Sequence, residues 1–195
     1  MGGVQAGGKA VVINGKSVLA IIPARSGSKR IPNKNIKEFL GKPLIIHTIE
    51  HALEASYIDR VIVDTDSEEI IKIARENGAE APFLRPAELA QDASQVIDNI
   101  MHTLNKLKED EGYDPTHVFI LQTTSPLREV EDIDKCWDLM QRSNATTVLT
   151  VCSTHPRLYH LTEDNDIVLV NGTEAASTNI QDWPPGYILN GCFVY

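Results

Sequence analysis

Residues 17–35, SVLAIIPARSGSKRIPNKN, decide the fold of this chain. An apolar run through Pro23 gives way to a loop that carries Gly27 and a high density of Lys and Arg. Many α/β proteins hold a phosphate chain at such a strand end, because backbone N–H groups and cationic side chains there face the phosphate oxygens. The stretch therefore predicts a strand over about 17–23 and a loop that grips a nucleoside triphosphate.

The basic loop matches neither of the two familiar glycine-rich phosphate motifs. It lacks the GxxxxGK[ST] spacing of a P-loop, and Gly27 stands alone where a dinucleotide fold carries GxGxxG. A solvated basic loop is the plain alternative. We favour a phosphate loop because its donors directly follow a buried strand, at the carboxyl edge where open α/β sheets bind ligands.

The composition bounds the class of protein. The 195 residues are 42% hydrophobic, which suits one globular domain with a sizeable core. A net charge of −9 argues against a general nucleic-acid or anionic-membrane surface, and no apolar run reaches transmembrane length. Cys136, Cys152 and Cys192 are widely spaced and fit neither a disulfide framework nor a zinc site. This usage predicts a reducing, cytoplasmic setting.

Strands alternate with helices along most of the chain. Apolar periodicity and cap residues predict helices at about 43–56, 67–77, 96–112 and 129–142, and further strands at 59–66, 116–122 and 145–153. Such alternation implies right-handed crossovers and a mostly parallel, Rossmann-like sheet with helices on both faces. In the helix at 96–112 the inward positions are expected to be Val96, Ile97, Ile100, Met101, Leu104 and Leu107.

The alternation stops after Ser153. Residues 153–187 contain no clear helix and read as turns and a short hairpin with a strand at 167–170, an excursion typical of a substrate-site or subunit-contact element. The last run, 188–195, predicts one more strand, and a doubly wound domain normally continues beyond such a strand. We therefore expect a C-terminally truncated domain over 17–195, preceded by a glycine-rich flexible tail at 1–16.

The motif LQTTSPLR, residues 121–128, reaches the same edge of the predicted sheet as the basic loop. The Gln122 amide can donate and accept hydrogen bonds, the adjacent hydroxyls are polar, and Arg128 offers a charge-assisted fork. Ser125 before Pro126 also fits the N-cap of the next helix, and the two interpretations are compatible.

Two further groups of residues could bind a ligand, and each also has an ordinary structural explanation. The loop RPAELAQDAS at 85–94 can hold a base or ribose, or be an ordinary loop with a cap. Asp64 and Asp66 are chemically suited to Mg²⁺, but Asp66 and Ser67 fit a turn and a helix cap better. His155 has no Ser/His/Asp arrangement around it in the sequence and is interpreted as structural.

The motifs together resemble one family. PARSGSKRIPNKN, RPAELAQD, LQTTSPLR, HP and QDWPPGYILNG, in this order and spacing, resemble the CMP-sialic acid synthetases (acylneuraminate cytidylyltransferases) from about Ser17 to the last residue. The resemblance implies a Rossmann-like domain with a dimerisation excursion, a homodimer and a Mg²⁺ cofactor. It also implies the activation of a sialic-type nonulosonic acid with CTP, which gives CMP-sugar and pyrophosphate.

The resemblance assigns roles to residues by their motif position. Arg25, Lys29 and Lys34 match the positions that hold the triphosphate and are the catalytic candidates. The implied nucleotide-binding residues are Ala24, Arg25, Ser28, Lys29, Lys34, Asn35, Arg85, Ala93 and Ser94, and the implied sugar-binding residues are Gln122, Ser125 and Asn190. Metal ligands stay unassigned, because the metal-binding aspartates of the family lie beyond Tyr195.

One departure from the family pattern keeps the sugar open. Thr178, Asn179 and Ile180 stand where the family often carries arginines that reach the sugar. The enzyme alternative is a cytidylyltransferase for pseudaminate or for the eight-carbon sugar of lipopolysaccharide. A non-catalytic nucleotide-binding module is the alternative from another class. Gln122 favours the sialic branch, because many other sugar nucleotidyltransferases place a metal-binding Asp there.

Overall fold

The computed structural model describes residues 15–91, 94–154, 159–164, 166–169 and 185–195. The chain divides into two compact units, one running to Leu149 and including Gly191–Tyr195, the other comprising Thr150–Asn190. The second unit corresponds broadly to the predicted excursion. The predicted tail, apart from Gly15 and Lys16, lies outside the described residues.

The main sheet of the protein has five strands. In spatial order its strands are β4 (Arg60–Asp64), β1 (Val18–Pro23), β5 (His117–Leu121), β9 (Gly186–Val194) and β6 (Val148–Thr154). Strand β1 pairs in parallel with β4 and β5, whereas β9 runs antiparallel to β5. The predicted mostly parallel α/β sheet is therefore confirmed, and the final predicted strand is its antiparallel member.

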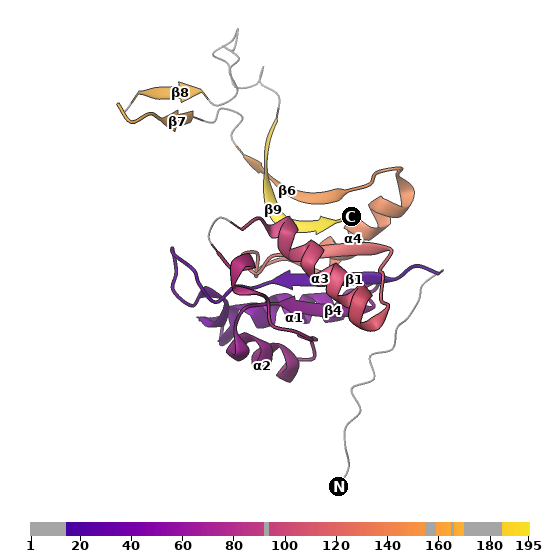
Figure 1. Ribbon diagram of the computed structural model, residues 1–195. Helices are drawn as coiled ribbons and strands as arrows, with labels where there is room; N and C mark the ends of the chain where they lie inside the picture. Colours follow the sequence, from indigo (N-terminus) through magenta and orange to yellow (C-terminus); the bar gives the residue numbers. More distant parts are fainter. Residues whose placement is uncertain (1–14, 92–93, 155–158, 165, 170–184) are drawn as a thin grey trace. The chain divides into compact units, whose positions relative to one another are not determined.

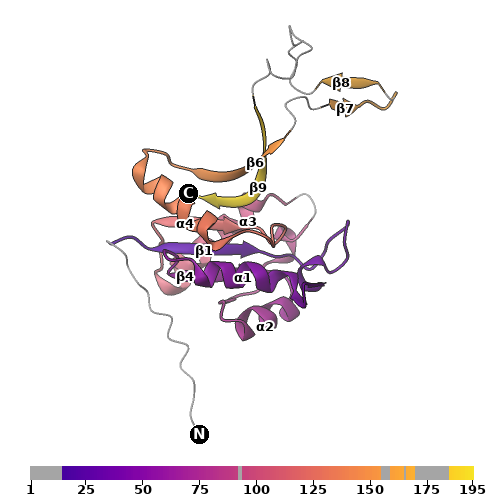
Figure 2. The same ribbon diagram turned by 180° about the vertical axis from the view of Figure 1, so that it is seen from behind.

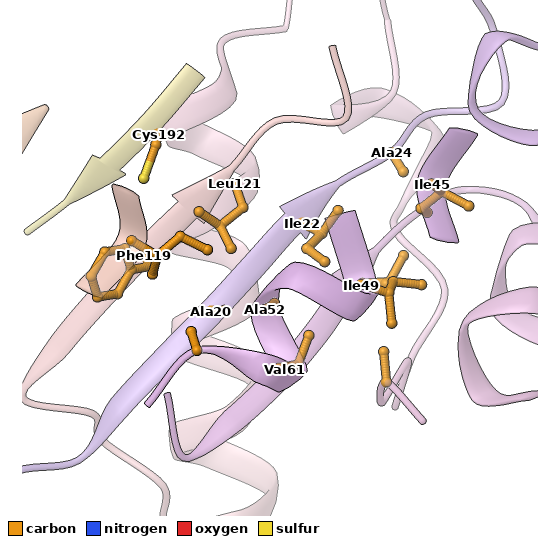
Figure 3. Close-up of a cluster of buried hydrophobic side chains, with 14 of the residues drawn as sticks. Ala20, Ile22, Ala24, Ile45, Ile49, Ala52, Val61, Phe119, Leu121 and Cys192 are labelled. Carbon is orange, nitrogen blue, oxygen red and sulfur yellow. The ribbon is translucent and has the colours of Figure 1, made fainter. Parts of the chain in front are cut away.

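Strand β1 is buried on both faces, which explains its unbroken apolar run. Val18, Ala20 and Ile22 pack in one cluster with residues of α1 (Leu44–Glu54), α2 (Glu68–Glu76) and α4 (Val130–Arg142). Figure 3 draws part of this cluster, including Ala20 and Ile22. Leu19 and Ile21 pack on the opposite face with α3 (Val96–Glu111). Helices thus cover both faces of the sheet, as the views in Figures 1 and 2 show.

Helix α3 meets the sheet through only part of the predicted apolar face: Ile100 and Leu107 are buried as expected, and Leu104 packs against their cluster. The side chains of Val96, Ile97 and Met101 are 42%, 49% and 48% exposed, so their predicted inward orientation is wrong. Asn99 and Thr103 are buried instead, one helical turn apart. The apolar pattern misled because polar residues occupy part of the inward stripe.

Of two helix caps predicted from the sequence, one is confirmed and the other is wrong. Ser67 caps α2 as expected, with its Oγ accepting a hydrogen bond from the Ile70 N–H at 3.3 Å. Ser125 is not the cap of α4, however: Glu129 is, in a reciprocal capping box with Asp132. The helix therefore starts four residues after Pro126, which leaves the loop that follows β5 free to shape a site.

The second unit contains a small hairpin of β7 (Tyr159–Leu161) and β8 (Ile167–Leu169), paired antiparallel. This matches the predicted hairpin with a strand at about 167–170. His155 and residues 178–180, which entered the sequence argument, lie outside the described residues. Cys136, Cys152 and Cys192, all within the described residues, form no disulfide bond. No helix in the described ranges has the length and apolarity needed to cross a membrane.

Candidate active site

A pocket of about 280 Å³ lies where β1 and β5 end. It is lined by Pro23, Arg25, Lys34, Asn35, Arg85, Leu89, Gln91, Ser94, Val96, Asn99, Gln122, Thr123 and Thr124. Three of these side chains are cationic, and none of the described residues in the lining is acidic. The pocket lies at the carboxyl edge of the parallel strands, where α/β sheets bind ligands, and its charge suits an anion.

The pocket brings together six of the residues that the sequence singled out: Arg25, Lys34, Asn35, Arg85, Ser94 and Gln122. Ser28 and Lys29 belong to the basic loop but not to the lining, and Ala24 is buried behind it. Ala93 lies outside the described residues. Asn190 belongs to the second unit, where it hydrogen-bonds Thr150. The ligand contacts of all these residues stay predictions.

The basic loop is anchored to the end of β4. The Ala24 N–H donates to the Asp64 carbonyl at 2.9 Å. The backbone N–H and the hydroxyl of Ser26 each donate to a carboxylate oxygen of Asp66 at 2.7 Å. Asp66, which we interpreted from the sequence as a turn residue, therefore holds the basic loop in place.

The segment after the loop brings Lys34 and Asn35 back to the pocket through a short 3-10 helix, Lys34–Ile36. It begins after Asn33, whose φ of 53° lies in the left-handed region that Asn tolerates. The Asn35 side chain donates to the Arg25 carbonyl at 2.9 Å and accepts from the Thr123 hydroxyl at 2.8 Å. Asn35 thus joins the basic loop to the loop that follows β5.

Burial lowers the pKa of Lys34 below its ordinary value, and the neighbouring positive charge of Arg25 lowers it further. Both effects arise because a cation in a partly dry site, close to another cation, is destabilised. A bound polyanion would reverse the second effect and stabilise the charged ammonium. The pair is therefore arranged electrostatically for an anionic ligand.

Arg85 reaches the pocket from a buried ion pair. Its Nε and Nη2 donate to the two carboxylate oxygens of Asp64 at 3.0 and 2.6 Å, and Nη2 also donates to the Asp64 carbonyl at 2.7 Å. Burial raises the pKa of the Asp64 carboxyl, and the Arg85 guanidinium opposes that rise. Asp64 is therefore committed to Arg85.

Asn99 extends this network from helix α3. With its amide oriented to satisfy both groups, Nδ2 donates to the Leu89 carbonyl at 2.8 Å and Oδ1 accepts from Arg85 Nη1 at 3.3 Å. Arg85 thus has at most one of its five N–H donors left for a ligand. Sequence reasoning missed Asn99; the available signal was a polar residue within a stripe of a helix that faces the core.

The described residues do not by themselves fit a Mg²⁺ site. They contain no group of three or more His, Cys, Asp or Glu side chains placed to hold a metal ion. Asp64 and Asp66, the carboxylates considered from the sequence, are engaged by Arg85 and Ser26. The Mg²⁺ cofactor therefore stays a prediction.

A Rossmann-like sheet with a cationic pocket at the carboxyl ends of its parallel strands is typical of α/β nucleotide-binding proteins. A family model described as "Cytidylyltransferase" matches residues 19–177. The chain belongs to this family of nucleotidyltransferases, which confirms the family resemblance of its motifs.

Named relatives differ in the sugar that they act on. The chain is 35% identical over 183 residues to a pseudaminic acid cytidylyltransferase of Campylobacter jejuni, covering 91% of this chain and 77% of the relative. It is 45% identical over 116 residues to a CMP-N,N'-diacetyllegionaminic acid synthase of Legionella pneumophila, covering 60% of this chain and 50% of that protein.

The fold is similar to that of a solved CMP:2-keto-3-deoxy-manno-octonic acid synthetase complexed with CTP. The TM-score is 0.70 at 19% identity, with 92% of this chain and 74% of the other covered. At this identity the likeness supports the cytidylyltransferase fold alone.

Proposed function

We propose that this chain binds CTP in the pocket and transfers the cytidylyl group to a nonulosonic acid, giving CMP-sugar and pyrophosphate. One observation carries the proposal. A chain of the cytidylyltransferase family lines one pocket with Arg25, Lys34 and Gln122, with no acidic side chain among the described lining residues. A triphosphate beside the two cations would leave the amide of Gln122 for the sugar.

In the proposed reaction the anomeric hydroxyl oxygen of the sugar bonds to the α-phosphorus of CTP. The bond from that phosphorus to the oxygen bridging to the β-phosphate breaks, pyrophosphate leaves with the electron pair, and the hydroxyl proton passes to solvent water. Such transfers depend mainly on positioning and on charge stabilisation. Arg25 and Lys34 would offset the charge of the triphosphate, and Lys29, in the same basic loop, would add a further positive charge.

Mg²⁺ belongs to the proposal as a counter-charge of the triphosphate. Mg²⁺ commonly binds through phosphate oxygens, waters and only one or two carboxylates. Within the described residues Asp64 and Asp66 already have other partners. The proposal therefore assigns no protein ligand to the ion.

The sugar has two leading candidates. A sialic-type acid such as legionaminate is supported by the higher identity, 45%, to the legionaminic acid synthase. Pseudaminate is supported by a match that extends over 91% of this chain. The eight-carbon sugar has support only from a likeness of fold.

We also propose a homodimer formed through the second unit. Within that unit Tyr187, Ile188 and Leu189 of β9 are 58%, 50% and 60% exposed. Consecutive large apolar side chains at this exposure are typical of a protein–protein contact. Light scattering of the purified chain tests this proposal, and a monomer at micromolar concentration contradicts it.

Nucleotide binding tests the first half of the proposed reaction. Equilibrium titration with CTP, ATP, GTP and UTP in the presence of Mg²⁺ should show a preference for CTP. The affinity for CTP should fall in Lys34→Ala and be kept in Lys37→Ala, whose side chain is exposed nearby and does not line the pocket. Equal affinity for all four nucleotides contradicts the proposal.

Sugar choice is tested by pyrophosphate release. CTP is supplied with N-acetylneuraminate, legionaminate, pseudaminate or the eight-carbon acid sugar in parallel reactions. Release with one of the nine-carbon acids identifies the substrate class. CTP binding without release on any sugar would instead favour a nucleotide-binding module.

A further inference from the structure

Arg128 is a buried cation that the proposed reaction does not use. It closes the motif LQTTSPLR, directly before Glu129, the N-cap of α4, and it is only 8% exposed. It is not among the residues that line the pocket. The Arg128 guanidinium, which the sequence suggested as a ligand contact, is therefore engaged inside the protein.

The guanidinium of Arg128 joins the end of β5 to β9. Its Nη2 donates to the Gly191 carbonyl at 2.8 Å and to the Gln122 carbonyl at 3.1 Å. The Gly191 carbonyl also accepts the Gln122 N–H at 3.0 Å. Both backbone polar groups of Gln122 are thus fixed, one by Gly191 and the other by the arginine bound to Gly191.

The backbone at Gly191 also confines the side chain of Gln122. Gly191 has a φ of +86°, and a Cβ added there would lie 3.0 Å from Ser125 Oγ and 3.3 Å from Gln122 Cβ. The same position lies 3.4 Å from Gln122 Oε1. The amide of Gln122 is therefore bounded on one side by β9 and borders the pocket on another.

Burying the guanidinium of Arg128 costs free energy that packing alone does not explain. Its Nη1 is buried and has no hydrogen-bond partner among the described residues. Burial lowers the pKa of the guanidinium, and no described carboxylate lies within ion-pair distance. A buried polar group without a partner costs about 1–3 kcal/mol, and an apolar side chain of similar volume would avoid this cost.

We propose that Arg128 is a positioning residue for sugar recognition, which fixes the backbone of Gln122 against Gly191 and so aims the Gln122 amide at the acid sugar. The inference rests on the proposed function, in which Gln122 meets the sugar. It also requires that Arg128 affects the sugar more than the nucleotide, because Asp66 anchors the basic loop separately.

The test compares two ligands that differ only in the sugar. Titration calorimetry measures the Kd of CMP and the Kd of CMP linked to N-acetylneuraminate, legionaminate or pseudaminate, and their ratio reports the contribution of the sugar. Arg128→Met should keep the Kd of CMP within about threefold and reduce the ratio by roughly tenfold, the effect of one misplaced hydrogen bond. Arg128→Lys, which can still donate to a carbonyl, should recover part of the ratio.

The matched control is Arg142→Met, at the exposed end of the same helix. It should leave both Kd values unchanged. If Arg128→Met does not fold, Arg128→Lys alone provides the test. Its ratio of CMP Kd to sugar-nucleotide Kd should then be lower than in the wild type, while its Kd for CMP stays unchanged.

A double-mutant cycle shows whether Arg128 acts through Gln122. The ratio in the double variant Arg128→Met/Gln122→Ala should be no lower than in Gln122→Ala alone, because residues that share one function are not additive. Additive losses overturn the inference, as does a loss of CMP affinity equal to the loss of sugar-nucleotide affinity. If the wild type binds the sugar nucleotides no more tightly than CMP, the sugar half of the proposed function fails, and the inference falls with it.

Discussion

Asp66 accepts two hydrogen bonds from Ser26, one from its backbone N–H and one from its hydroxyl, both at 2.7 Å. Asp66 and Ser26 lie in the loops that directly follow two neighbouring parallel strands, β4 and β1 respectively. The basic loop is therefore held by the adjacent strand and not only by its own turns. Pre-organisation of this kind reduces the entropy that a ligand must pay on binding.

Asp66→Ala should weaken CTP binding by roughly tenfold, because the ligand must then order a loop that Asp66 no longer holds, at a cost of about 1–1.5 kcal/mol. Asp66→Asn should lose less, since an amide can still pair with Ser26. Titration with CTP measures both variants. Asp138→Ala, an exposed carboxylate on α4, is the control, and equal affinities in Asp66→Ala and Asp138→Ala would contradict the anchoring role.

The ion pair of Asp64 with Arg85 should control stability as well as the site. Both side chains are almost fully buried, at 0% and 2% exposure. Arg85→Met leaves the carboxylate buried without its partner and should lower the free energy of unfolding by about 3–5 kcal/mol. Lys108→Met removes an exposed pair with Asp114 and should cost less than about 1 kcal/mol. Urea denaturation measures both, and similar losses would be inconsistent with the prediction.

The sequence predicted those features of the site that depend on local pattern. The unbroken apolar run of β1 and the charge that follows it placed Arg25 and Lys34 at the right edge of the sheet. Parallel strands present their carboxyl ends together, so Gln122 was expected at the same edge before any distance was available. The family motifs added Asn35, Arg85 and Ser94.

The remaining features depend on distances that local pattern does not contain. The pairing of Asp64 with Arg85 joins residues 21 positions apart, and the bond from Arg128 to Gly191 spans 63 positions. The sequence around an Asp or an Arg does not indicate which distant residue it will pair with. Asn99 was hidden for a related reason, because exposed apolar residues on α3 dominated its apparent periodicity.

The pH dependence of CTP binding should report the charge of Lys34. Its pKa is lowered in the free protein, so affinity should be full below that pKa and fall as pH rises through it, starting below 10.5. Bound triphosphate raises the pKa again, which is the linkage that produces the fall. Measurements above about pH 8 avoid titration of the phosphates themselves.

Two substitutions make this assignment specific. Lys34→Arg should remove the fall, because a guanidinium stays protonated throughout this range. Lys37→Arg, at an exposed position on the same segment, should leave the fall as it is in the wild type. A profile that is the same in Lys34→Arg as in the wild type assigns the titration to another group.

Gly191→Ala should impair the site by more than backbone strain alone would. A residue with a side chain at positive φ costs about 1–2 kcal/mol wherever it stands. At Gly191 the new Cβ would also meet Ser125 Oγ at 3.0 Å, whereas at Gly112, with a φ of +67°, it would meet nothing within 4 Å. Gly112→Ala is therefore the control for strain alone. Thermal unfolding should show the larger loss for Gly191→Ala, and only that variant should lose turnover of the acid sugar at saturating CTP; equal effects of the two substitutions would show that close packing against Gln122 has no role.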